Sequence, residues 1–368
     1  MTNSVSSASF SKKNVTKAVR KYKFTVRNAD GSLSTIIDIR PATFEPVPQA
    51  RFYELIMAVC GGNYSRADAT LYGVIEDWDV SLIDDMSGAF LNQKTFNRDI
   101  SRWNTSRVVT MEYMFHGASV FNQAIGDWDV SNVTKMNGMF FNARAFNHPL
   151  DKWNVTKVTN MSAMFCGASA FNQPLDDWDV QNVTAMRSMF CQAKAFNQGL
   201  KSWNTGLVED MKDMFAEATV FNGAIASWNV NRVKTMRGMF ELAISFDQPL
   251  DGWNVSHVTD MTAMFSGAAA FNHPLGNWDT RSVASMSYLF ECTHRFHQPL
   301  ERWNVSAVTD MMGMFADAKR FDQPLDGWDV SAVTNMTGMF AGATAFSQSL
   351  ESWKVSQRVF GKIFVPVH

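Results

Sequence analysis

The sequence predicts an α/β solenoid of about 11 to 12 coils, each of 25 residues. All twelve tryptophans of the chain lie 25 residues apart, from Trp78 to Trp353, without an insertion or a deletion between them. A fixed period between about 20 and 50 residues is typical of a solenoid, because each repeat is too small to bury its own apolar face and stacks on its neighbours. A hydrophobic content of 46% is ordinary for a folded chain and excludes wholesale disorder.

Each coil is expected to begin with a short strand. In the repeat that starts at Leu150, the apolar Trp153 and Val155 alternate with the polar Asn154. Successive side chains of a strand point to opposite faces, so the two apolar side chains would face inward and the amide outward. The strands of successive coils would then pair in parallel and form one continuous sheet along the solenoid.

A helix is expected to follow the strand. Thr156 is a natural N-cap, and Val158, Met161, Phe165 and Ala168 recur at spacings of three, four and three residues. This spacing predicts one apolar stripe along about three helical turns. Gly167 lies near the end of the stripe, where a left-handed residue is often needed, and Gly117, Gly267 and Gly342 match it.

The repeated apolar positions predict the core. Columns of Trp, Val, Leu, Met and Phe would run along the interior, and the Met columns are interpreted as core filler rather than as metal ligands. The Asn after each Phe forms a further column, which we interpret as a ladder that satisfies turn backbone groups from coil to coil. Its members are Asn97, Asn122, Asn147, Asn172, Asn197, Asn222 and Asn272.

The two ends of the chain depart from the repeat. Residues 1–13 are rich in Ser and Asn and are predicted to be a disordered tail, while residues 14–74 would form an N-terminal cap. The cap would hold a hairpin from Lys23 to Ile37 and a helix from about Gln49 to Val59 that ends at Gly61. Repeats would occupy residues 75–355, and residues 356–368 would form a short, extended C-terminal cap.

The phrase L-x-x-W-x-V-S-x-V-x-x-M-x-x-M-F-x-x-A-x-x-F-N-Q-x-L resembles the 25-residue repeats of the BspA-like family of leucine-rich-repeat surface proteins, which in mycoplasma sequences are named DUF285. The likeness to the shorter BspA-type repeat runs from Leu150 to Ala168, with Trp153 and Val155 at the two Ile positions of that repeat. The resemblance covers about three quarters of the chain. It implies a leucine-rich-repeat-like solenoid and a role in adhesion or protein binding.

The residues that flank each Trp are predicted to form an acidic binding face. The two positions before each Trp and the one after it carry fifteen acids and five bases, a net charge of about −10. Such a face would attract a basic protein surface and repel nucleic acid. The candidate binding residues are Asp77, Asp79, Asp127, Asp129, Asp151, Asn154, Asp176, Asp177, Asp179, Asp279 and Asp329.

Two features of this face suggest finer hypotheses. The residue after Trp alternates between Asp and Asn over most of the chain, as in Asp129 and Asn154, which would relieve repulsion between carboxylates stacked about 4.8 Å apart. Three coils carry Asp-Trp-Asp, as in Asp127 and Asp129, and on a strand such a pair could bind Ca²⁺. Solvated surface carboxylates are the simpler interpretation, and no other cofactor or metal is predicted.

Nothing in the sequence indicates an enzyme, since no phosphate-binding loop, nucleophile elbow or catalytic triad is found. The four cysteines are interpreted as free thiols: Cys60, Cys166, Cys191 and Cys292. Without a membrane span, signal peptide or anchor, the chain is expected in the cytoplasm or on a particle, or on a surface if a leader was removed. The leading hypothesis is a non-enzymatic protein-binding or adhesion scaffold, and the alternative is a self-assembling structural component, for example of a virion.

Overall fold

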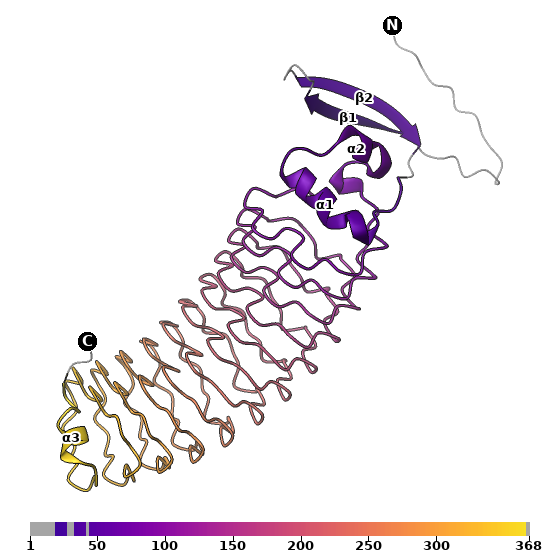
Figure 1. Ribbon diagram of the computed structural model, residues 1–368. Coiled ribbons are helices and arrows are strands. Elements are labelled where there is room, and N and C mark those ends of the chain that lie inside the picture. The colour runs from indigo at the N-terminus through magenta and orange to yellow at the C-terminus, as the bar shows by residue number, and fades with distance from the viewer. Residues whose placement is uncertain (1–18, 28–32, 42–43, 366–368) are drawn as a thin grey trace.

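The protein is an elongated, curved stack of 25-residue coils with short helices at its two ends (Figure 1). The computed structural model describes residues 19–27, 33–41 and 44–365. A two-stranded hairpin and two helices lie at the N-terminal end of the stack, and one short helix lies at the C-terminal end. No helix in the described ranges is long and apolar enough to cross a bilayer.

The predicted hairpin is present as strands β1 (Val19–Arg27) and β2 (Leu33–Pro41), which pair antiparallel with Lys23 opposite Ile37. Its turn at 28–32 and the predicted tail at 1–13 lie outside the described residues. The predicted helix is α1 (Gln49–Cys60), and Gly61 ends it by donating its N–H to the carbonyl of Met57.

A second helix, α2 (Arg66–Tyr72), was not expected, because seven residues are too few for a clear apolar stripe. Ser65 caps it by accepting a hydrogen bond from the N–H of Asp68 at 3.0 Å. A single 3₁₀ turn, η1 (Ile75–Asp77), then leads into the first coil.

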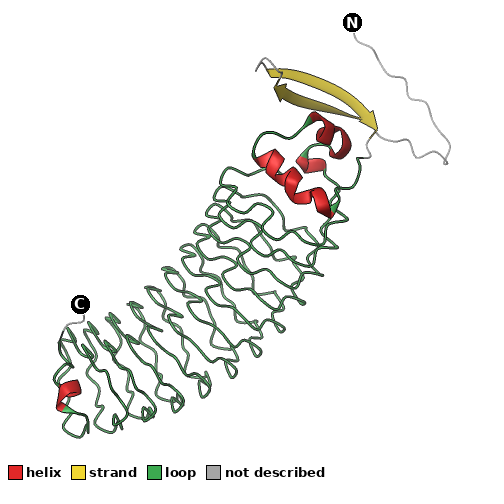
Figure 2. Ribbon diagram, in the orientation of Figure 1, coloured by secondary structure: helices red, strands yellow, loops and turns green. Residues whose placement is uncertain are grey.

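The predicted strand–helix coil, and with it the α/β fold class, is wrong. From Trp78 to Trp353 the described chain consists of tight turns and single bridging residues, so Figure 2 draws the whole stack as loops. In the coil from Leu150, the N–H groups of Trp153, Val158 and Met164 each donate to the carbonyl three residues earlier, at 2.9–3.2 Å. Bonds that reach back three residues close tight turns. In an α-helix each N–H would instead donate to the carbonyl four residues earlier.

The apolar stripe fails to form a helix because every second amide of that segment donates to the next coil. The N–H groups of Met161, Ala163, Phe165 and Gly167 donate to carbonyls 24 residues later, at 2.7–3.0 Å. Ala163 and Gly167 also have positive φ angles of 54° and 70°, which a right-handed helix does not allow. The left-handed conformation predicted at Gly167 is therefore confirmed, but it belongs to a turn.

The predicted continuous sheet is reduced to a ladder of single residues. Parallel bridges join one residue of each coil to its equivalent in the next, from Asp85 and Thr110 to Asp310 and Asn335. The Ser or Thr that was predicted to cap a helix lies in a turn instead. The N–H of Thr156, for example, donates to Oδ1 of Asn154 at 3.2 Å.

The predicted core is confirmed. Trp153, Val155, Met161 and Phe165 are all at least 97% buried, and the same holds in nearly every coil. Aromatic rings of neighbouring coils stack, with centroids 6.3 Å apart for Trp153 and Trp178. Each Trp from Trp103 onward donates its indole N–H to a buried carbonyl 28 residues earlier, which satisfies the one polar atom that it takes into the core.

The predicted Asn ladder is confirmed as well, although its side chains are partly exposed to solvent. Oδ1 of Asn172 accepts from the N–H of Asn197 at 2.9 Å and from Nε2 of Gln198 at 3.0 Å. The same pattern joins successive coils along most of the stack. Each rung therefore fixes the turn of the following coil relative to its neighbour.

Both ends of the stack are covered by chain of a different kind. At the N-terminal end, Nε2 of Gln49 and the hydroxyl of Tyr53 donate to the carbonyl of Asp85 at 2.9 and 3.2 Å. At the C-terminal end, the expected extended cap is wrong: helix α3 (Gln357–Phe360) and a following turn occupy this place.

The Asn ladder makes a prediction about stability. Asn172→Ala removes the acceptor for two hydrogen bonds from the next coil, and should lower the free energy of unfolding by about 1 kcal/mol. Asn172→Asp keeps the acceptor and should change it by less than about 0.5 kcal/mol. Asp247 and Asp322 occupy this position naturally and accept equivalent bonds. Urea denaturation measures the free energy of unfolding of both variants. An Asp variant as unstable as the Ala variant would contradict the role of the ladder.

Candidate functional site

The acidic and amide side chains that flank the tryptophans form a surface that we call the acidic edge. It consists of the two residues before each Trp and the one after it. Among the candidate residues, Asp77, Asp79, Asp176 and Asp279 are half-buried. The others are exposed, namely Asp127, Asp129, Asp151, Asn154, Asp177, Asp179 and Asp329.

The residue after each Trp has a role in the local fold. Oδ1 of Asp129 accepts from the N–H of Ser131 at 3.0 Å, and Oδ1 of Asn154 accepts from the N–H of Thr156 at 3.2 Å. This side-chain turn recurs in coil after coil. Asp and Asn present the same oxygen to the backbone, so the turn accepts either residue, and the alternation changes only the charge of the edge.

Ion pairs neutralise part of the acidic edge. Asp77 pairs with Arg102 at 2.8 Å and Asp127 with Lys152 at 2.7 Å, in both cases between neighbouring coils. Asp279 pairs with Arg281 at 2.8 Å. Ion pairs near the surface contribute little to stability, but each places a positive charge beside a carboxylate that a partner would meet.

The remaining charge is densest on the coils between Asp127 and Asp179. Asp129, Asp151, Asp177 and Asp179 lie there, all exposed, and none has a salt bridge within the described residues. Asp176, beside Asp177, accepts from the N–H of Ser202 at 2.8 Å. We call this group of five aspartates the central acidic patch.

Hydrogen bonding favours the ionised form of Asp129. The hydroxyl and the backbone N–H of Ser131 hold the pKa of Asp129 below its usual range, and the charge of Lys157 acts in the same direction. Ser331 does the same for the pKa of Asp329 at the far end of the edge. These carboxylates therefore carry full negative charge at neutral pH.

The strand that would have paired the Asp-Trp-Asp carboxylates for Ca²⁺ does not exist. Asp127 lies in a turn against Lys152, while Asp129 is turned toward Ser131. In the described part of the chain, no group of three or more His, Cys, Asp or Glu side chains is arranged to hold a metal ion. The cysteines are free thiols, as predicted, with Cys166 and Cys191 at the same position of adjacent coils.

Sequence reasoning missed a second acidic group, away from the acidic edge. Burial raises the pKa of Asp213 and of Glu241, and neighbouring acids add to the rise at Glu241. Both residues fall in the segment that was predicted to be a helix, where their partial burial between coils could not be foreseen.

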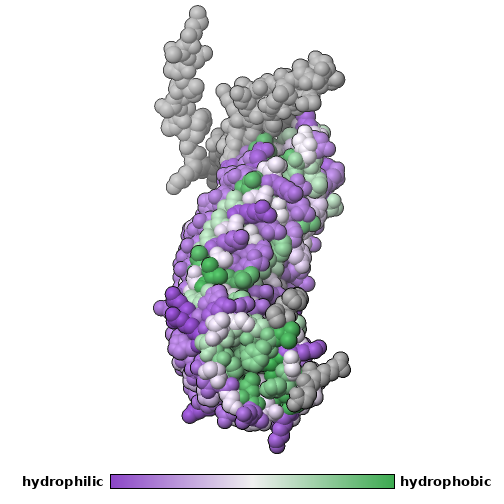
Figure 3. Space-filling model, turned by 90° about the vertical axis from the view of Figure 1, so that its left-hand side faces the viewer, coloured by the Kyte–Doolittle hydropathy of each residue, from purple (hydrophilic) through white to green (hydrophobic). Residues whose placement is uncertain are grey.

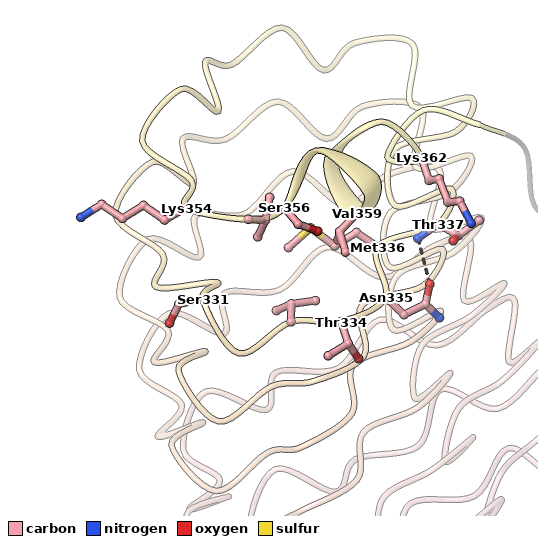
Figure 4. Close-up of a pocket in the computed structure, with 11 residues that line it drawn as sticks. Ser331, Thr334, Asn335, Met336, Thr337, Lys354, Ser356, Val359 and Lys362 are labelled. Atoms are coloured by element: carbon pink, nitrogen blue, oxygen red, sulfur yellow. Dashed lines mark hydrogen bonds between the residues drawn. The ribbon is translucent and has the colours of Figure 1, made fainter.

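Sequence reasoning also missed a pocket of about 490 Å³ at the C-terminal end of the stack (Figure 4). It lies between the last complete bridging segment, around Asn335, and the C-terminal segment that contains Lys354, Val359 and Lys362. The sequence does hold a signal for it, because the repeat phrase stops after Ser356. In addition, Lys354 is the only base among the residues that follow a Trp.

Comparison with known protein families gives one match. The family described as "Mycoplasma protein of unknown function, DUF285" matches residues 62–178, 168–278 and 270–364. These three stretches follow one another along nearly the whole coil stack. No curated protein matches the chain.

The hydrogen bonds of Ser131 predict a shift in the pKa of Asp129. Ser131→Ala removes the hydroxyl but keeps the backbone N–H, so the pKa of Asp129 should rise toward its usual value of about 3.9. In the wild type the lowered pKa stabilises the folded state above that value, and this contribution is lost as the pH falls through the folded-state pKa. Carboxyl ¹³C NMR titration measures the pKa of Asp129. Ser331→Ala is the control, and it should shift the pKa of Asp329 only. An unchanged pKa of Asp129 in the Ser131 variant would refute this explanation.

Proposed function

Because the chain belongs to the DUF285 family of repeat proteins, we propose that it is a non-enzymatic scaffold that binds a partner protein through the acidic edge. The observation that carries this proposal is the central acidic patch. Its aspartates are mostly exposed and have no salt bridges among the described residues. A basic protein surface fits this charge.

A role in binding fits the repeated architecture better than catalysis does. An enzyme needs a unique group of side chains in one place, whereas each coil presents nearly the same side chains as the next. An extended stack offers a long surface on which a partner can contact several coils at once. Adhesion, which the resemblance to BspA-like proteins implies, is the narrower form of this proposal, with the partner fixed to a surface.

The proposal predicts that charge removal on the edge weakens binding without harming the fold. The test variant combines Asp129→Asn, Asp177→Asn and Asp179→Asn, since Asn occurs naturally at equivalent positions in other coils, as at Asn154 and Asn277. The matched control combines Asp210→Asn, Asp260→Asn and Asp310→Asn at the bridging position, where Asn160 and Asn335 occur naturally. Both variants lose three charges.

Partners are captured from the native source with the wild type and quantified, and affinity is then measured with the purified partner. We expect the edge variant to bind at least about tenfold more weakly and the control to bind like the wild type, with wild-type affinity falling as salt is raised. Equal capture by both variants, or affinity independent of salt, would rule out binding through the acidic edge.

A further inference from the structure

The ladder of bridges ends at Asn335 with two backbone groups unused. In the preceding coil, the carbonyl of Thr309 accepts from the N–H of Thr334 at 2.9 Å, and the N–H of Met311 donates to the carbonyl of Asn335 at 2.8 Å. The equivalent groups of the last rung are the carbonyl of Thr334 and the N–H of Met336. Neither has a hydrogen-bond partner within the part of the chain that the structure describes.

The rung is open because the chain leaves the repeat at this point. In a complete coil the N–H of residue 359 would donate to Thr334, but in α3 the N–H groups of Val359 and Phe360 both turn back to the carbonyl of Ser356 at 3.0 Å. The chain rejoins the stack only afterwards, where the N–H of Gly338 donates to the carbonyl of Lys362 at 2.9 Å. The space between is the pocket of about 490 Å³.

The walls of this pocket favour an acidic, partly apolar occupant. Val333, Met336 and Val359 line it together with hydroxyl side chains, and no carboxylate is among the described lining residues. Figure 4 shows the side chain of Lys362 running toward Thr337, beside Asn335, while the ammonium group of Lys354 points away. A carboxylate placed above Asn335 would therefore meet the charge of Lys362.

The C-terminal end of the stack also carries exposed apolar side chains. Figure 3 looks onto this end of the molecule and shows hydrophobic residues gathered there. Phe364 and Val365 are among the exposed large hydrophobic residues, at 58% and 48% exposure. Exposed apolar surface at the same end of the stack as unused backbone groups is typical of a docking edge.

We propose that this pocket binds an extended, acidic peptide segment of another protein, of the type Val-Thr-Asp-Met, by completing the open rung. Within the stack the same space above each rung is filled by such a segment of the next coil, as by Val308, Thr309, Asp310 and Met311 above the rung of Ser285. The valine and methionine of that segment are fully buried, and its main chain supplies one donor and one acceptor. Addition of a peptide backbone to an exposed edge is an established mode of recognition.

The probe is the fluorescein-labelled peptide Ser-Ala-Val-Thr-Asp-Met, which has the sequence of residues 306–311, titrated with the full chain by fluorescence anisotropy. We expect saturable binding. Methylation of the threonine N–H, which would meet the carbonyl of Thr334, should weaken binding at least about tenfold, as should Asp→Lys in the peptide. The two changes separate main-chain from charge recognition.

A charge exchange tests the role of Lys362. Lys362→Glu should weaken binding of the aspartate peptide at least about tenfold and restore binding of the lysine peptide, while Lys194→Glu, on an exposed lysine of a middle coil that lies outside both the pocket and the acidic edge, should change neither. Melting curves check that both variants are folded. Because none of the aspartates of the central acidic patch lines the pocket, Lys362→Glu should leave partner capture through that patch unchanged.

Two results would overturn the proposal. One is the absence of saturable binding at millimolar peptide, or equal binding of the methylated and unmodified peptides. The other is concentration-dependent self-association of the chain, seen by sedimentation and abolished by Lys362→Glu, without peptide binding. In that case a second copy of this chain, and not another protein, occupies the pocket.

Discussion

The structure depends on one arrangement, the hydrogen bonds that each coil makes to the next. In the segment from Asn160 to Gly167, and in its equivalents in the other coils, every second backbone N–H donates to the next coil and not within its own coil. Only a following coil in the same register can accept these bonds. An insertion of one residue would therefore leave a row of buried amides unpaired. This explains why twelve tryptophans follow one another at 25 residues without a slip. The aromatic columns can stack only if the backbone bonds hold every coil in the same phase.

Sequence reasoning succeeded where one interaction dominates and failed where two local structures share a pattern. Trp153 and Val155 had to face inward whatever the backbone did, because burial of apolar surface decides their direction. Spacings of three and four residues, as in Val158, Met161 and Phe165, fit an α-helix, but they also fit successive tight turns. The choice between them depends on the amides that bond to the next coil and on the left-handed backbone at residues such as Ala163, whose side chain gives no sign of it. The predicted helix is therefore wrong because of hydrogen bonds between coils, which the pattern of one repeat does not show.

The candidate binding residues were recognised by charge, and the structure gives several of them a second role. Asp129 and Asn154 each close a turn through Oδ1, which is the property that the fold requires at this position. Because an amide meets that requirement as well as a carboxylate does, the charge of the edge can differ from coil to coil at little cost in stability. Asp151 and Asp177, which make no comparable bond among the described residues, carry charge without such a role. The fold gives no reason for a charge at these two positions, so the reason must lie in what the surface meets.

The direction of the backbone bonds makes the two ends of the stack chemically different. At the N-terminal end the first rung presents the carbonyl of Asp85 and the N–H of Asp84. Gln49 and Tyr53 donate to that carbonyl, and Oε1 of Gln49 accepts from that N–H. At the C-terminal end the last rung presents the carbonyl of Thr334 and the N–H of Met336, and the N–H groups of Gly338 and Phe340 follow it. Lys362 and Ile363 supply carbonyls to Gly338 and Phe340, but the N–H of Met336 has no partner in the described residues. A group that completes this end must therefore accept a hydrogen bond at Met336 and donate one to Thr334, which a peptide backbone does in its extended form. The polarity of the coils thus limits what can dock at this end before any side chain is considered.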